Sequence, residues 1–152
     1  MEKCVFAGSF DPITNGHLEV IKKASQTYEQ VTVGILVNWD KNYYLTKEQR
    51  IESVTDALSF LPNVVVKYYD GTLTDFLKQE NTNIFVRGIR NIKDLEYENM
   101  CKEYHQQFMP DIRYVYFYLE EYKSISSSLI KQMAKNGEDI SPLVPKNVIK
   151  YF

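Results

Sequence analysis

The segment from Gly8 to His17 contains residue types that suit the binding of a phosphate group. Glycine at position 8 lets the backbone approach a ligand closely, and Gly16 and His17 fall where a helix is expected to begin. The free N–H groups of a first helical turn attract anions, and an imidazole there can donate to a phosphate oxygen. A lone histidine in a first turn is more often a solvated surface residue, so the prediction depends on the residues around it.

A second set of polar residues, Arg87-Gly88-Ile89-Arg90, directly follows an expected strand over 84–86. Both arginines should therefore emerge at the same edge of a sheet as His17. The forked guanidinium group suits phosphate oxygens, and two neighbouring cations without an anion would be unfavourable, which favours a bound phosphate. The alternative is a solvated pair of arginines on a loop.

A third set is the serine-rich run from Ser124 to Ser128, which leads into an expected helix over 126–135. Serine commonly caps a helix, but a cap needs only one hydroxyl group. Consecutive hydroxyls at a helix N-terminus therefore indicate phosphate binding rather than capping alone.

Strand and helix patterns alternate along the chain. Strands are expected over 3–7, 30–38, 64–69, 84–86 and 113–119, and helices over 15–24, 46–62, 73–79, 94–108 and 126–135. Thr46 to Gln49 matches a capping box that begins a helix, and Pro62 is expected to end that helix. The alternation predicts an α/β fold, a Rossmann-like doubly wound five-stranded parallel sheet with helices on both faces, formed by residues 1–152 as a single domain. Ligands of such sheets bind beyond the carboxyl ends of the strands.

Composition excludes several classes of function. The 152 residues are 44% apolar and 25% charged, with a net charge of −2. That charge gives no basic field for nucleic acid, and the apolar runs are too short to cross a membrane. The N-terminus lacks a signal-peptide pattern, so a cytoplasmic location is expected. Cys4 and Cys101 show no metal-ligand spacing and are expected to be reduced, buried thiols.

Thr14-x-Gly16-His17 and the Ile125 to Ser128 run resemble the (H/T)xGH and Ile-Ser-Ser-Ser motifs of the nucleotidylyltransferase superfamily. The Arg87 to Glu98 segment is similar to the RGLR…DFEYE segment of the phosphopantetheine adenylyltransferase family, and the resemblance extends over nearly the whole chain. Ser9 stands where threonine is frequent in that family, and it retains the hydroxyl that a phosphate contact needs.

The resemblance implies transfer of the adenylyl group of ATP to 4′-phosphopantetheine, giving dephospho-coenzyme A and pyrophosphate, by a homohexamer. It implies that the acceptor is bound by Ser9, Lys41, Leu73 and Arg87. It implies that ATP is bound by Ser9, Phe10, His17, Gly88, Ile89, Arg90, Glu98, Tyr122, Lys123, Ser124, Ile125, Ser126, Ser127 and Ser128. His17, Lys41 and Arg90 are the expected catalytic residues.

A phosphate monoester is already an anion at neutral pH, so direct in-line attack on the α-phosphorus needs no protein nucleophile. Catalysis then depends on aligning two polyanions and neutralising the charge that develops. The sequence has no acidic cluster that suggests a protein metal site, so Mg²⁺ is expected to arrive with ATP.

Two alternatives remain open at the level of sequence. One is a nucleotidyltransferase of the same superfamily with a different acceptor, nicotinamide mononucleotide or glycerol phosphate. The other is a nucleotide-binding domain without catalytic activity. His105 is expected to have a surface or helix-packing role rather than a catalytic one, and Tyr114 to Tyr118 is expected to form core or subunit contacts.

Overall fold

The computed structural model describes residues 2–152, where parallel strands alternate with α-helices. The strands are β1 (Lys3–Gly8), β2 (Gln30–Leu36), β3 (Val64–Tyr69), β4 (Ile84–Ile89) and β5 (Arg113–Tyr118). The helices are α1 (Asn15–Thr27), α2 (Lys47–Ala57), α3 (Leu73–Gln79), α4 (Ile92–Gln106), α5 (Ser127–Lys135) and the 3₁₀ helix η1 (Lys146–Tyr151).

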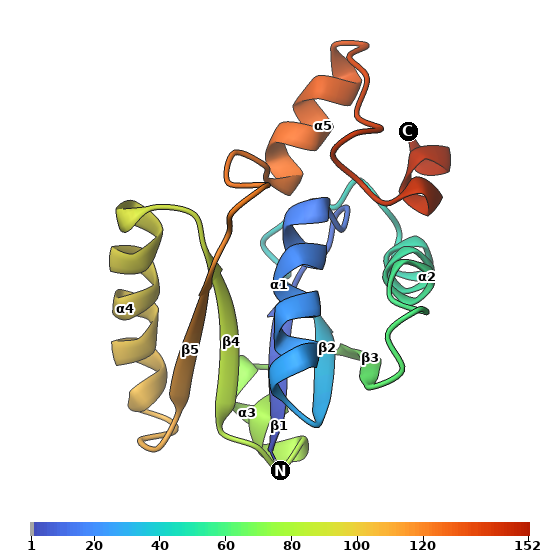
Figure 1. The fold of residues 1–152 in the computed structure, drawn as a ribbon. Helices are drawn as coiled ribbons and strands as arrows, with labels where there is room; N and C mark the ends of the chain where they lie inside the picture. Colours follow the sequence, from blue (N-terminus) through green and yellow to red (C-terminus); the bar gives the residue numbers. More distant parts are fainter. Residues whose placement is uncertain (1) are drawn as a thin grey trace.

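The strands form one sheet in the order β3-β2-β1-β4-β5 (Figure 1). All four strand pairs are parallel, and the central strand β1 places Val5 beside Thr32 of β2 and Phe85 of β4. The chain first builds outward from β1 through β2 to β3, and then returns to β4 on the other side. The point where the direction reverses, between β1 and β4, is where ligands of such sheets bind. The predicted fold class is confirmed.

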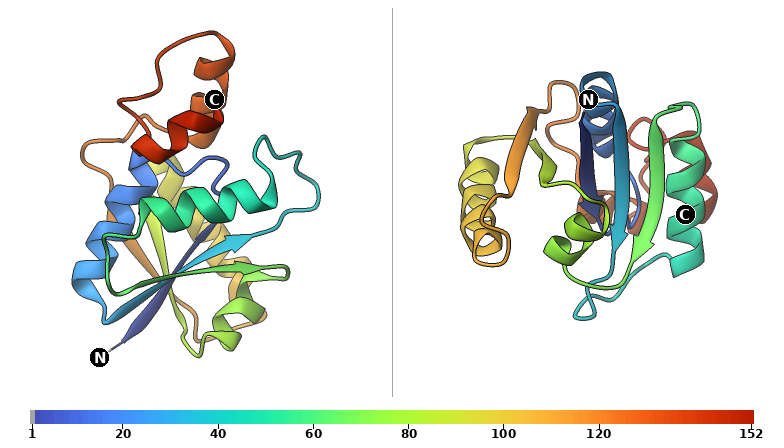
Figure 2. Two further views of the ribbon diagram at one scale, coloured as in Figure 1. Left: turned by 90° about the vertical axis from the view of Figure 1, so that its right-hand side faces the viewer. Right: turned by 90° about the horizontal axis from the view of Figure 1, so that it is seen from below.

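Helices cover both faces of this sheet (Figure 2). On one face, Phe6 and Val33 pack into a core with residues of α1, α2 and α5. On the other face, Val5 and Phe85 pack with Phe76 of α3. Successive strand residues therefore serve opposite cores, as the alternation of side chains along a strand requires.

Local sequence signals account for most element boundaries. The capping box at Thr46 and Gln49 is present, and the helix that ends at Lys135 is followed by Gly137 with a positive φ of 75°. Several boundaries differ from the prediction. The second strand ends at Leu36, α1 continues to Thr27, α2 ends at Ala57, β4 continues through Ile89, and α4 spans Ile92–Gln106.

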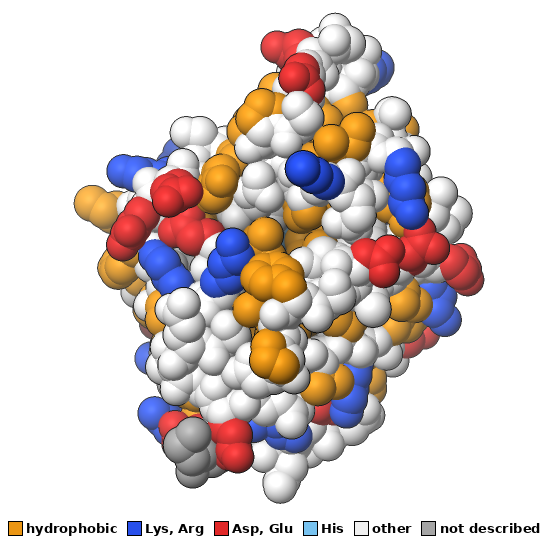
Figure 3. All heavy atoms as spheres, turned by 45° about the vertical axis from the view of Figure 1, so that its right-hand side comes forward, with side chains coloured by type: hydrophobic (Ala, Val, Ile, Leu, Met, Phe, Trp, Pro, Cys, Tyr) orange, Lys and Arg blue, Asp and Glu red, His pale blue; other side chains and the backbone are white. Residues whose placement is uncertain are grey.

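Charged side chains of both signs are interspersed on the face shown in Figure 3. Between residues 2 and 152, the structure contains no helix that is long and apolar enough to cross a bilayer. Both cysteines are free thiols. Cys4 is buried as predicted, and burial raises its pKa to about 12. The prediction for Cys101 is wrong, because that side chain is only partly buried and lines a cavity.

Candidate active site

Two cavities open side by side at the carboxyl ends of β1 and β4. The first cavity has a volume of about 320 Å³ and is bordered by His17, Arg90 and Ser126. The second cavity has a volume of about 430 Å³ and is bordered by Ser9 and Leu73. Both cavities share the lining residues Ala7, Gly8, Arg87, Tyr97 and Glu98. Two ligands that occupied them would therefore meet near Arg87.

His17 is held at the start of α1 by a capping box. The Nδ1 atom of His17 accepts a hydrogen bond from the backbone N–H of Thr14 at 3.0 Å. The backbone N–H of His17 in turn donates to the Thr14 hydroxyl at 3.3 Å. Histidine here takes the place of the usual glutamate or glutamine at this position. Since Nδ1 accepts a hydrogen bond, the proton of a neutral imidazole lies on Nε2. That N–H group is the one left for a ligand in the first cavity.

The electrostatic environment keeps the His17 imidazole neutral. Burial, together with the positive charges of Arg87 and Arg90, lowers its pKa to about 4. The ring also contacts the edge of the Phe10 ring, with 5.0 Å between centroids. In the free protein at pH 7, His17 is therefore a hydrogen-bond donor rather than a source of positive charge.

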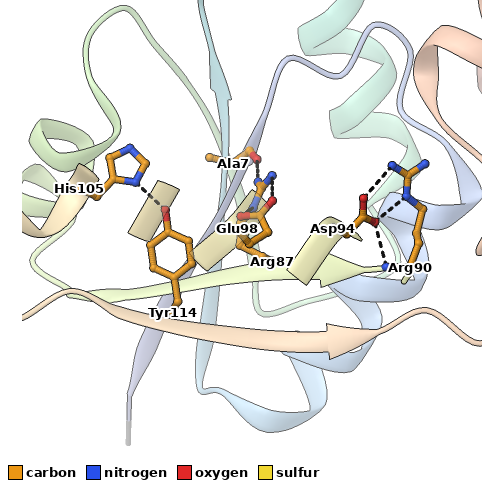
Figure 4. Close-up of polar contacts among 7 residues, drawn as sticks. All are labelled: Ala7, Arg87, Arg90, Asp94, Glu98, His105 and Tyr114. Carbon is orange, nitrogen blue, oxygen red and sulfur yellow. Dashed lines mark hydrogen bonds and ion pairs between the residues drawn. The ribbon is translucent and has the colours of Figure 1, made fainter. Parts of the chain in front are cut away.

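Arg87 and Arg90 each have a carboxylate partner (Figure 4). Arg87 donates from Nε and Nη2 to Glu98 at 3.0 and 2.9 Å, and from Nη1 to the carbonyl oxygen of Ala7 at 3.1 Å. Arg90 donates from Nε to Asp94 at 2.9 Å. Burial alone would raise the pKa of Asp94, but the hydrogen bonds and charge of Arg90 hold it below its usual range.

These pairs correct two expectations. The arginines are not two neighbouring cations without an anion, because Glu98 and Asp94 already balance them. Arg87, Gly88 and Ile89 also lie within β4 instead of following it. Alternation along the strand turns Arg87 toward α4, whereas Gly88 faces Val20 of α1.

Two serines of the C-terminal motif form hydrogen bonds within the protein, whereas a third is exposed. Ser126 caps α5, since its hydroxyl accepts the N–H of Leu129 at 3.1 Å, and the Ser127 hydroxyl donates to the carbonyl oxygen of Pro12 at 2.8 Å. Both line the first cavity with Ile125. Ser128 is exposed on the first turn of α5. This helix N-terminus therefore borders the same cavity as His17.

Asp11 ties the loop after β1 to two other parts of the site. Its buried carboxylate accepts the backbone N–H groups of Tyr44 and Leu45 at 2.9 and 2.8 Å, and it pairs with Lys131 of α5 at 3.2 Å. Arg50 of α2 is buried and donates to the carbonyl oxygen of Ser9 at 3.3 Å. The loop after β1 is therefore fixed to α2, to α5 and to the segment after β2.

The structure brings many of the predicted site residues together, but not all of them. The first cavity is lined by His17, Arg87, Gly88, Arg90, Glu98, Ile125, Ser126 and Ser127, and the second by Ser9, Leu73, Arg87 and Glu98. The side chains of Phe10 and Ile89 are buried in the interior. The residues that line neither cavity are Phe10, Lys41, Ile89, Tyr122, Lys123, Ser124 and Ser128.

Sequence reasoning missed one polar pair in the second cavity. His105 was expected to have a surface or helix-packing role; its Nδ1 lies 2.5 Å from the hydroxyl of Tyr114, and both residues line the cavity. Figure 4 shows this pair at one end of β4, with Arg87–Glu98 next and Arg90–Asp94 at the other end. Burial and the charge of Arg87 lower the pKa of His105. No spacing in the sequence signals the pair, because it joins α4 to β5.

Comparisons with known proteins show the family to which the chain belongs. The cytidylyltransferase-like family matches residues 5–133. A phosphopantetheine adenylyltransferase from Clostridium tetani (strain Massachusetts / E88) is 42% identical over 151 residues, which cover 99% of this chain and 94% of the relative. The chain belongs to the phosphopantetheine adenylyltransferase family.

A second phosphopantetheine adenylyltransferase, from Vesicomyosocius okutanii, is 38% identical over 95% of this chain and 92% of its own length. Among solved structures, a nicotinic acid mononucleotide adenylyltransferase from Plasmodium falciparum superposes with a TM-score of 0.74 at 18% identity, covering 98% of this chain and 93% of the other. That structural likeness shows the fold. Membership of the phosphopantetheine adenylyltransferase family makes this chain a nucleotidyltransferase enzyme.

Proposed function

We propose that this enzyme transfers the adenylyl group of ATP to 4′-phosphopantetheine, giving dephospho-coenzyme A and pyrophosphate in coenzyme A biosynthesis. One observation carries the proposal: two cavities meet at Arg87, so two phosphorylated ligands can lie end to end with their phosphates at the junction. Full-length relatives with the corresponding name support the identity of the two substrates.

ATP is assigned to the first cavity. The N-terminus of α5 and the His17 Nε2–H group offer donors to its phosphates, and Ile125 to Ser127, the middle of the Tyr122 to Ser128 segment, line the cavity. Phe10 and Ile89 have buried side chains, so any contact from them comes through the backbone. Arg90, which lines this cavity beside its partner Asp94, is assigned to the α-phosphate of the adenylyl group that is transferred.

The acceptor is assigned to the second cavity, with its phosphate toward Arg87 and Ser9 and its arm along Leu73. Lys41 lies on the exposed loop after β2, and its backbone N–H donates to the carbonyl oxygen of Asn38, which lines this cavity. Lys41 does not itself line the cavity, and its assignment to the acceptor phosphate rests on the family resemblance. Attack by a phosphate oxygen on the α-phosphorus then expels pyrophosphate without a covalent enzyme intermediate.

The Mg²⁺ complex of ATP is assigned as the substrate. Among residues 2–152, no three His, Cys, Asp or Glu side chains form a cluster suited to a metal ion. Asp94 and Glu98 are the carboxylates that line the first cavity, and each is bonded to an arginine. The metal would therefore be held mainly by ATP phosphates and water, as Mg²⁺ commonly is in such reactions.

We also propose a homo-oligomer, a hexamer by the family resemblance. The outer side of α4 exposes large apolar side chains, including Ile92, Met100 and Tyr104, which are 76%, 59% and 55% exposed. A contiguous apolar surface of this kind favours subunit contact. Residues 1–152 are proposed to act as one domain, and the free thiols agree with a reducing cytoplasm.

A pyrophosphate-release assay tests the function. The purified enzyme is given Mg²⁺-ATP with 4′-phosphopantetheine, nicotinamide mononucleotide or glycerol 3-phosphate in separate reactions. We expect release with 4′-phosphopantetheine and formation of dephospho-coenzyme A. Pyrophosphate release only with nicotinamide mononucleotide or only with glycerol 3-phosphate would identify a different nucleotidyltransferase. Tight ATP binding without release for any acceptor would indicate a binding protein.

A further inference from the structure

Glu19 of α1 binds the backbone of the segment that follows β5. One carboxylate oxygen accepts the N–H of Glu120 at 2.8 Å, and the other accepts those of Glu121 and Tyr122 at 3.3 and 3.4 Å. Successive N–H groups that converge in this way form an anion-binding concavity. Here an internal carboxylate fills it.

Lys23 completes the arrangement one helical turn later. Its ammonium group lies 3.2 Å from Glu19 and donates to the carbonyl oxygen of Tyr118 at 2.9 Å. Burial alone would raise the pKa of Glu19, but the hydrogen bonds from the Glu120 N–H and Lys23 lower it. The carboxylate is thus ionised at neutral pH and fixes the end of β5 to α1.

The same helix carries His17 two residues earlier, and the same segment continues into the serine run. Gly16 lies next to this segment, because a Cβ built on it would be in van der Waals contact with the carbonyl oxygen of Tyr122, at 3.7 Å. Farther along, Ser127 is bonded to Pro12. The segment after β5 is therefore held to α1 by the hydrogen bonds of Glu19 and to the loop after β1 by that of Ser127.

We infer that Glu19 is a positioning residue for ATP: it sets the Tyr122 to Ser128 segment at a fixed distance from His17. This inference rests on the proposed function, in which that segment and His17 hold the same nucleotide. Glu19 itself lines neither cavity, but of the two the segment that it holds borders only the ATP cavity, through Ile125 to Ser127. Loss of Glu19 should therefore weaken ATP binding and leave acceptor binding unchanged.

The test compares Glu19→Ala and Glu19→Gln with the wild-type enzyme in steady-state assays. We expect Glu19→Ala to raise the KM for ATP by about tenfold to hundredfold, the change for losing hydrogen bonds to a charged group. The KM for 4′-phosphopantetheine should change less than about twofold. Glu19→Gln retains one carbonyl acceptor and should recover part of the loss.

Glu120→Gln is the matched control, because the exposed Glu120 carboxylate lies 3.6 Å from the same Lys23 but accepts none of these backbone bonds. It should behave as wild type. Hydrogen exchange of the amides at 120–122 should accelerate in Glu19→Ala but not in the control. Thermal unfolding and fluorescence titration with ATP are measured in parallel, so that a folding defect is distinguished from a local one.

An unchanged KM for ATP in a folded Glu19→Ala enzyme would overturn the inference. Equal increases in both KM values would also overturn it, because they would indicate general loosening of the site. A wild-type enzyme that releases no pyrophosphate would instead contradict the proposed function. In that case ATP titration of the same variants still decides whether Glu19 positions the nucleotide segment.

Discussion

Arg87 and Glu98 form a bidentate ion pair at the junction of the two cavities, with N–O distances of 3.0 and 2.9 Å. A third bond fixes the guanidinium group to the carbonyl oxygen of Ala7 in β1. The ion pair joins β4 to α4, and the bond to Ala7 joins β4 to β1, across the point where the sheet reverses direction. A guanidinium group held on three sides presents its remaining N–H groups in a fixed direction, which suits recognition of a phosphate.

Arg87→Lys should impair use of the acceptor. Lysine retains the positive charge but cannot bond Glu98 with two parallel donors and also reach Ala7. We expect kcat/KM for 4′-phosphopantetheine to fall by about 10². Steady-state kinetics measure this value.

Arg113→Lys is the control for this variant, because Arg113 forms an exposed ion pair with Glu2 at the other end of the sheet. Its kcat/KM should match that of the wild type. If Arg87→Lys also retained the wild-type value, the junction would not be where the acceptor phosphate binds.

His17→Ala and His17→Gln together test whether the N–H donor of His17 acts in catalysis. Glutamine is a normal residue at this position of a capping box, so the hydrogen bond with Thr14 can be retained. The glutamine amide also keeps an N–H group that can reach the phosphates, so we expect His17→Ala, which loses that donor, to lower kcat by about 10²–10³ with little change in the KM for ATP, and His17→Gln to retain more of the activity. Equal losses in kcat and in ATP affinity would contradict a role specific to the transition state.

The depressed pKa of His17 predicts a stability effect with a definite sign. Between pH 6.5 and about 4, the unfolded chain binds a proton that the folded protein excludes, so stability falls as the pH falls. Above pH 6.5 both states are neutral and the effect is absent. The full shift in the pKa of His17 corresponds to a loss of about 3 kcal/mol in the free energy of unfolding.

Urea unfolding of the wild type and of His17→Gln at several pH values isolates this effect, since other titrating groups are common to both proteins. The stability of the wild type relative to the variant should decrease from pH 7 to pH 4. A constant difference would show that His17 titrates normally in the folded protein. ATP should reduce the decrease, because bound phosphates favour the imidazolium ion.

Much of the fold could be predicted because its signals are local. The Val- and Ile-rich run of β3 and the capping box at Thr46 each lie within a few residues. The predicted end of β4, at Val86, was wrong. Gly88 has low strand propensity, and pairing with β5 keeps Arg87 and Gly88 extended. Tertiary context overrides propensity at that point.

The site was harder to predict, because its geometry depends on partners from distant elements. His17, Arg90 and Ser126 were expected at one rim, and all three line the first cavity. The carboxylate partner of Arg87 and the pairing of His105 with Tyr114 depend on how α4 packs against the sheet. A one-dimensional pattern does not contain that packing.

Gly88 provides a test of how closely α1 must approach the sheet. A Cβ at this position would lie 2.7 Å from Cγ2 of the buried Val20, which is one helical turn beyond His17. Gly88→Ala should therefore displace α1, reduce stability by about 1–3 kcal/mol and lower kcat. Thermal unfolding and kinetics measure the two effects.

Val20→Ala removes the methyl groups that Gly88→Ala would contact, so the double variant should recover activity, with a favourable coupling of about 1 kcal/mol in stability. Gly34→Ala is the control, since its Cβ would contact Phe76 of α3 on the opposite face of the sheet. It should lose stability, and Val20→Ala should not rescue it. If Val20→Ala rescued both glycine variants or neither, contact between α1 and β4 would not be what positions His17.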